Sequence, residues 1–252
     1  MLKIAKKIKT YPGLGDSVLI YPIAKWFLSK NSIVKVETKF GDVFIELEKN
    51  SLFSSSEELS HPTVQIDYKN QSHTNKNIFE DICHLAGVPD IEFALDHPGG
   101  KIRIPYEYCV VKPPYFKYTR HNDTTPEPNQ VQETINFIQK HMPVILVRHK
   151  DDIGYKFDNV KEIKVDNVSD LIGIIKSSSL SISQHGHFQH IAESLSIKSL
   201  VLFSSKMKKS ELDSVKMMSP KKVIIKKSTR YLFDDDCEFH RKLRQEYENW
   251  FG

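Results

Sequence analysis

The second half of the chain alternates strand-like and helix-like segments without interruption, and this alternation limits the folds open to it. Short runs rich in β-branched residues are each followed by a segment whose apolar residues recur every three or four positions. This alternation is typical of a doubly wound parallel sheet with helices on both faces. We therefore predict strands at 106–111, 144–148, 160–165, 180–183 and 199–203, and helices at 131–141, 168–176 and 187–195.

The first half shows the same alternation less regularly, and the tail adds two elements. We predict strands at 2–9, 33–38 and 64–68, helices at 16–30 and 77–85, and a strand at 222–226 before a helix at 237–250. Gly87 suits the left-handed end of the helix at 77–85. The chain thus divides into two Rossmann-like α/β lobes, residues 1–104 and 105–252, with a ligand cleft expected between them.

Composition and charge exclude several classes of protein. Of the 252 residues, 39% are hydrophobic and 27% are charged, which indicates a globular chain. Apolar runs are too short for a membrane span and no signal peptide is evident, so we expect a cytoplasmic protein. The three cysteines form no CxxC pair, which favours free thiols over a disulfide frame or zinc site. The net charge of +4 gathers partly at 206–230, as a solvated surface or as a patch that attracts a polyanion.

The first candidate site is the loop Gly13-Leu14-Gly15-Asp16, directly before a predicted helix. Gly13 and Gly15 allow a sharp turn and a close approach of the backbone to a ligand. The helix N-terminus behind them favours anions. Asp16 either caps the helix or acts as a general base, and the loop alone leaves both open.

The second candidate site is the run SQHGHFQHIA, at the junction of a predicted strand and helix. His185, Gly186, His187 and His190 lie in it. Because no cysteine or second acidic group completes a ligand set, we predict no metal here. Neutral imidazoles that hydrogen-bond a phosphate, ribose or sugar hydroxyl are the functional interpretation, and histidines without function are the alternative.

The third candidate is the long polar connection 113–128, which contains Lys117 and Arg120. Its cations suit a diphosphate, although a disordered linker is equally consistent with its composition. Arg148 and His149 end a predicted strand and are expected to face the same crevice as donor-binding residues.

In two stretches the chain resembles the ADP-heptose:lipopolysaccharide heptosyltransferases, inverting glycosyltransferases of the GT-B fold. One is GLGDSVLIYPIAKWF, and the other is VSDLIGIIKSSSLSISQHGHFQHIAESLSIKSLVLF. The resemblance implies that Asp16 is the general base, that Lys117 or Arg120 contacts phosphate, and that His190 is the histidine of the donor motif. His185, Gly186 and His187 stand where the family has Asp, Thr or Ser, and Gly.

The function expected from the resemblance is transfer of a sugar from a nucleotide-diphosphate sugar to an acceptor hydroxyl, with no cofactor and no metal. The acceptor is a saccharide or lipid-linked glycan. One alternative is transfer onto hydroxymethylated bases of DNA, and another is a nucleotide-sugar-binding module without turnover. The sugar, the nucleotide and the oligomeric state stay open.

Overall fold

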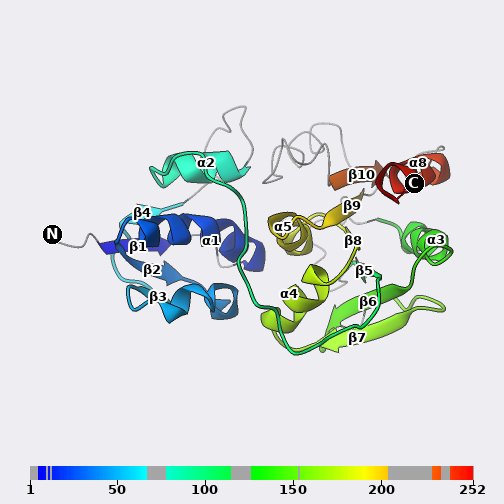
Figure 1. The fold of residues 1–252 in the computed structure, drawn as a ribbon, viewed down its shortest axis with the longest axis horizontal. Coiled ribbons are helices and arrows are strands. Elements are labelled where there is room, and N and C mark those ends of the chain that lie inside the picture. Colours follow the sequence, from blue (N-terminus) through cyan, green and yellow to red (C-terminus); the bar gives the residue numbers. More distant parts are fainter. Residues whose placement is uncertain are drawn as a thin grey trace.

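The computed structural model of the chain describes residues 5–9, 11, 13–66, 78–114, 126–152, 154–203, 229–233 and 239–251. It contains two sheets whose strand pairs all run parallel (Figure 1). The predicted α/β fold with two parallel sheets is therefore confirmed. Among the helices of these ranges, none combines the length and the apolar character needed to cross a membrane.

The first sheet has four strands in the order β3-β2-β1-β4. Helix α1 links β1 to β2, two short 3-10 turns lie between β2 and β3, and α2 follows β4. The bounds are β1 Ala5–Lys9, α1 Leu14–Ser29, β2 Ile33–Glu37, η1 Gly41–Phe44, η2 Leu47–Lys49, β3 Phe53–Ser56, β4 Val64–Gln65 and α2 Ile78–Leu85.

One face of this sheet carries the core of the first lobe. In β2, Val34 and Val36 are buried while Lys35 between them is exposed, as expected where one face is packed and the other is polar. Ile8 of β1 is buried together with the apolar residues of α1. The carboxyl ends of β1, β2 and β3 consequently meet at one edge, close to the start of α1.

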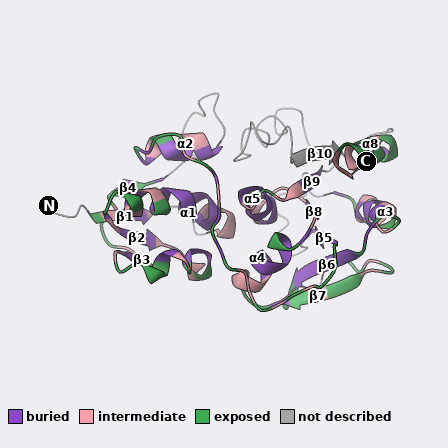
Figure 2. Ribbon diagram, viewed as in Figure 1, coloured by how far each residue is buried: buried purple, intermediate pink, exposed green. Residues whose placement is uncertain are grey.

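The second sheet has six strands in the order β10-β9-β8-β5-β6-β7. Its bounds are β5 Cys109–Lys112, α3 Pro128–Ile138, β6 Val144–His149, β7 Lys161–Val165, α4 Val168–Lys176, β8 Leu180–Ser183, α5 His187–Ser194, β9 Lys198–Phe203, β10 Thr229–Phe233 and α8 Phe239–Phe251. Strands β5, β6 and β8 are almost wholly buried because helices cover both faces (Figure 2).

Two apolar clusters form around the second sheet. The smaller packs α3 and α8 against one face. The larger packs α4 and α5 against the other face and continues into the core of the first lobe. The two lobes therefore share a continuous core on the side where α1 and α5 meet.

The segment between α2 and β5 contains no helix or strand and joins the lobes. Hydrogen bonds near its middle hold it to both lobes. Tyr21 of α1 donates its hydroxyl hydrogen to the carbonyl of Asp96 at 2.7 Å, and the Lys101 backbone N–H donates to Asp170 of α4 at 2.7 Å. The boundary predicted at residues 104 and 105 falls in this segment, and it stays a prediction.

Most predicted elements of the second lobe agree with the structure to within three residues. Gly87 has a φ of 65°, which confirms the left-handed end of α2. Strands β3 and β10 were not predicted, and β4 is shorter than expected. The strand predicted at 222–226 lies outside the described residues.

Candidate functional site

In the loop at the start of α1, the carboxylate of Asp16 lies against Gly13. The N-cap of α1 is Gly13, with an extended backbone at φ −89° and ψ 154°. The alternative in which Asp16 is the cap is therefore wrong, because Asp16 lies inside the first helical turn. A Cβ at Gly13 would overlap the Oδ2 atom of Asp16, so this position of the carboxylate requires glycine.

Gly15 brings this loop against the second lobe. A Cβ at position 15 would lie 3.1 Å from Cδ2 of His190 and 3.4 Å from Cα of His187, both in α5. The start of α1 faces α5 across the junction of the lobes (Figure 1). The structure thus brings the Gly13–Asp16 loop and the histidine motif, far apart in the sequence, into direct contact.

The start of α5 depends on a glycine with a special backbone. Gly186 is its N-cap and has φ 143° and ψ −158°, a conformation that side chains rarely adopt. Strand β8 ends at Ser183, so the chain turns within a few residues and presents the first N–H groups of α5 beside Gly15. The N-termini of α1 and α5 therefore meet, and each contributes a positive dipole end suited to an anion.

His187 and His190 are neutral in this environment. Burial lowers the pKa of His187 to about 4, with a further contribution from the positive charge of Lys112. Burial also lowers the pKa of His190 to about 3, assisted by His185 and His187. At neutral pH, each ring therefore offers one hydrogen-bond donor and one acceptor.

Several polar atoms at the end of β8 are buried without a hydrogen-bond partner among the described residues. They are Nδ1 of His190, Oγ of Ser183 and Oε1 of Gln184. His190 is only 6% exposed. Buried polar atoms are normally hydrogen-bonded, so this edge offers unused hydrogen-bonding capacity to a bound ligand.

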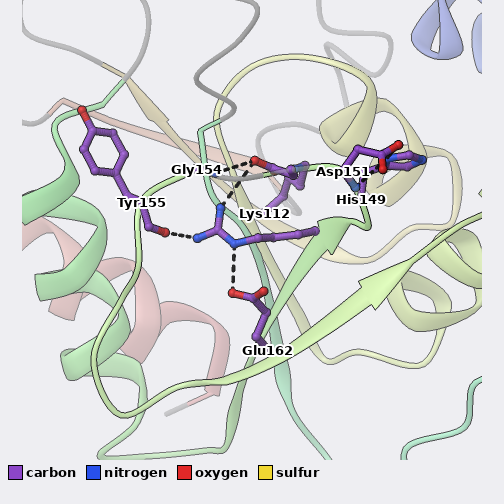
Figure 3. A network of polar contacts seen from close by, with 8 residues as sticks. Lys112, His149, Asp151, Gly154, Tyr155 and Glu162 are labelled. Atoms are coloured by element: carbon purple, nitrogen blue, oxygen red, sulfur yellow. Dashed lines mark hydrogen bonds and ion pairs between the residues drawn. The ribbon is translucent and has the colours of Figure 1, made fainter.

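Figure 3 shows a network of polar contacts at the carboxyl ends of β5 and β6. Arg148 donates from Nε to Glu162 at 3.0 Å and from Nη2 to the Tyr155 carbonyl, and its Nη1 lies 3.8 Å from Asp152. The Arg148 side chain is 3% exposed. Protein acceptors therefore bind Nε and Nη2, whereas the buried Nη1 has no hydrogen-bond partner among the described residues. The donor contact expected of Arg148 stays a prediction.

Lys112 belongs to the same network and was missed in the sequence. Its Nζ lies 3.0 Å from Oδ2 of the buried Asp152. Burial lowers the pKa of Lys112, while Asp152 opposes that shift. Because the Lys112 charge acts on His187, it belongs to the surroundings of the α5 N-terminus. Its position at the carboxyl end of a buried strand was the signal that could have identified it.

Of the other expected donor-binding residues, the structure describes only His149. His149 is exposed, with Nδ1 3.5 Å from Oδ2 of Asp151. Lys117 and Arg120 lie outside the described residues, as does most of the basic stretch 206–230. The roles expected of these residues stay predictions.

A cavity of about 370 Å³ opens at the carboxyl edge of the first sheet. It is lined by Lys9, Glu37, Thr38, Lys39, Glu57, Glu58 and Leu59. Lys9 and Glu37 pair at 3.0 Å, and Oγ1 of Thr38 lies 2.8 Å from Oγ of Ser17, the residue after Asp16. The cavity therefore adjoins the Gly13–Asp16 loop from the side of the first lobe.

Within the described part of the chain, no three or more His, Cys, Asp or Glu side chains are grouped so that they could hold a metal ion. Cys83 and Cys109 are buried, and neither forms a disulfide within the described part of the chain.

Solved structures show where this architecture occurs elsewhere. The chain is similar to a family 9 glycosyltransferase from Veillonella parvula, with a TM-score of 0.64 and 8% identity over 100% of this chain and 91% of that one. It is similar to the iron-containing dodecameric glycosyltransferase TibC from enterotoxigenic E. coli, with a TM-score of 0.57 and 14% identity over 80% of this chain. It is also similar to a UDP-GlcNAc 2-epimerase from Methanocaldococcus jannaschii, with a TM-score of 0.52 and 10% identity over 98% and 92% of the two chains.

The fold is thus the GT-B fold of heptosyltransferases and family 9 glycosyltransferases, as the resemblance implied. TibC has also been solved as a heptosyltransferase in complex with ADP-D-β-D-heptose. The matched region spans 59% of the length of TibC. The sequence matches no protein-family model and no curated protein.

Proposed function

We propose that this chain is a glycosyltransferase that moves a sugar from a nucleotide-diphosphate sugar to an acceptor hydroxyl with inversion. The contact of Gly15 with α5 carries this proposal. A glycosyl transfer needs a base beside the acceptor and a site that receives the departing diphosphate. The contact places a loop with a carboxylate, from one lobe, beside a helix N-terminus of the other.

In the proposed reaction, Asp16 accepts the proton of the acceptor hydroxyl as that oxygen attacks the anomeric carbon. The bond from the anomeric carbon to the diphosphate oxygen breaks, and the nucleoside diphosphate leaves with the bonding electrons. Backbone N–H groups of the first turn of α5 and the ammonium of Lys112 stabilise its negative charge. Lys117 or Arg120 is proposed to add a second cation.

The proposed acceptor is a saccharide or lipid-linked glycan bound at the cavity beside Ser17. The described lining has three glutamates against two lysines, a balance that disfavours a strongly anionic acceptor. A hydroxymethylated base in DNA is therefore the weaker alternative. Duplex binding with a steep salt dependence would support DNA, because phosphate contacts release counterions.

The first test is a thermal-shift panel of nucleotide sugars with the full chain. A donor at 100 times its dissociation constant should stabilise the fold by about 2.7 kcal/mol. Transfer to saccharide acceptors is then followed by mass spectrometry, and epimerisation of the nucleotide sugar by proton NMR, because epimers have the same mass. We also propose that the enzyme is cytoplasmic and needs no metal. The same assays with a metal chelator added test the second point. Binding without turnover of any donor would identify a binding module instead.

The second test is Asp16→Asn. We expect kcat to fall by about 10²–10⁴-fold while the donor dissociation constant stays unchanged. Because Asp16 also lies in the first turn of α1, the variant should lose only about 0.3–1 kcal/mol of stability. The exposed Asp90→Asn is the matched control. A full transfer rate in Asp16→Asn would exclude Asp16 as the base.

A further inference from the structure

Three polar side chains form a line along α5, one helical turn apart. Nδ1 of His185 lies 2.9 Å from Oε1 of Gln189, and Nε2 of Gln189 donates to Oε1 of Glu193 at 2.9 Å. Gln189 is 0% exposed and Glu193 is 1% exposed, whereas His185 is partly exposed. The line therefore runs from the buried interior to the edge of the candidate site.

The direction of these hydrogen bonds follows from the orientation of the Gln189 amide. Its NH₂ group, which only donates, faces Glu193. Its amide oxygen, which only accepts, faces His185. Nδ1 of His185 is consequently the donor, and in the neutral ring Nε2 carries the lone pair.

We propose that Gln189 and Glu193 hold His185 in the Nδ1–H tautomer, so that its Nε2 accepts a hydrogen bond from a hydroxyl of the nucleotide-sugar donor. The second half of this inference rests on the proposed function. It makes His185 the residue that selects a donor hydroxyl, and Gln189 and Glu193 the residues that position it.

The location of His185 fits this role. It directly precedes Gly186, the N-cap of α5, and its ring lies 5.8 Å from the His190 ring in an edge-to-face arrangement. His190 in turn contacts Gly15. A partner of Nε2 must supply a hydrogen, which a ribose or sugar hydroxyl does and an ionised phosphate does not. The diphosphate is therefore left to the N–H groups of α5.

Glu193→Met removes the acceptor at the end of the line and leaves the buried amide NH₂ of Gln189 without its partner, so the variant should be less stable than the unmodified chain. Stability therefore cannot separate a positioning role of Glu193 from a structural one. The tautomer of His185 can, because a merely structural role would not change it.

The test of the tautomer needs no ligand. The full chain is labelled with ¹⁵N-histidine, and the His185 signals are assigned by their loss in His185→Gln. We expect a protonated Nδ1 and an unprotonated Nε2. Glu193→Met and Gln189→Met should lose this preference, whereas Glu193→Gln, whose amide oxygen still accepts, should keep it. Ser194→Ala, a buried polar change on the same helix, is the matched control.

A protonated Nε2 in the unmodified chain would overturn the proposal. An unchanged tautomer in both methionine variants would overturn it equally, because neither side chain would then position His185.

The test of the hydroxyl uses ADP, UDP, GDP and CDP with their 2′- and 3′-deoxyribose counterparts, and nucleotide sugars with deoxy sugars. Loss of one hydrogen bond should weaken binding of one deoxy analogue by about 3- to 10-fold. The ribose and sugar arms distinguish the source of the hydroxyl. Glu193→Met and Gln189→Met should lose this discrimination, and Glu193→Gln should retain it.

The two measurements separate the possible failures. If nucleotides bind and no deoxy analogue binds more weakly, the assignment of His185 to a hydroxyl is wrong. If none of the nucleotides or nucleotide sugars binds, the proposed function fails together with that assignment, while the tautomer still decides whether the line of hydrogen bonds acts as described.

Discussion

Replacing Gly15 by alanine tests the contact on which the proposed function depends. The new Cβ would lie 3.1 Å from Cδ2 of His190 and 3.4 Å from the α5 backbone at His187. His190 is buried, so its ring cannot swing away. Overpacking of this kind costs about 1–3 kcal/mol, whereas alanine gains about 1 kcal/mol over glycine in a helix. We expect a net loss of about 0–2 kcal/mol, or up to about 8 °C in Tm for a chain of this size.

A double-mutant cycle with His190→Ala makes this prediction specific. Without the imidazole ring of His190, the new Cβ no longer has a neighbour at 3.1 Å, and Gly15→Ala should become neutral or stabilising. The coupling between the two changes should therefore be about 1–2 kcal/mol, measured by urea denaturation. Gly41→Ala, whose Cβ would meet only side chains of the first lobe, is the control and should not couple to His190. If Gly15→Ala and His190→Ala are additive within about 0.5 kcal/mol, the two lobes do not meet at this point in solution.

Two further predictions concern the electrostatics of the second lobe. The folded pKa of His190, about 3, lies below the unfolded value near 6.5, so only the unfolded chain takes up this proton as the pH falls below 6.5. His190 should then lower the free energy of unfolding by up to about 1.4 kcal/mol for each pH unit below 6.5. His190→Gln should remove this contribution, which denaturation series between pH 7 and 4 would measure. If the free energy of unfolding depends on pH equally in both proteins, the low pKa assigned to His190 is wrong. Lys112→Met should raise the pKa of His187 in an NMR titration, because the charge of Lys112 lowers it. The variant should also destabilise the fold by about 1–3 kcal/mol, because Asp152 loses a partner. An unchanged pKa of His187 would place Lys112 away from α5.

The elements of the second lobe were predictable because their signals are local. The helix expected at 168–176 and the strand at 180–183 coincide with α4 and β8, since apolar periodicity and a β-branched run each suffice to mark them. Strand β3 was not predictable, because Phe53–Ser56 reads FSSS and serine clusters usually indicate loops. Its strand character comes from parallel pairing with β2, a contact between distant residues.

The site was predictable only in part, for the same reason. The family resemblance marked Asp16 and His190, but it could not show that Gly15 contacts α5 of the other lobe. Asp16 was open to interpretation as a cap because aspartate favours N-caps, and only the helix start at Leu14 excludes that. Gln189 and Glu193 carried an unused signal. They follow His185 at four-residue steps, which places the three on one side of a helix.

The hydrogen-bond line in α5 also explains how a histidine can stand where the resembled family has an aspartate. A carboxylate at position 185 would accept a hydrogen bond from a donor hydroxyl, and a histidine of undetermined tautomer would not do so reliably. With Nδ1 donating to Gln189, the imidazole becomes an acceptor at Nε2 and fills the same chemical role. It does so without a negative charge at the positive end of α5, where the diphosphate is proposed to bind. We therefore propose that a histidine at position 185 keeps the recognition of a donor hydroxyl and avoids a negative charge beside the diphosphate.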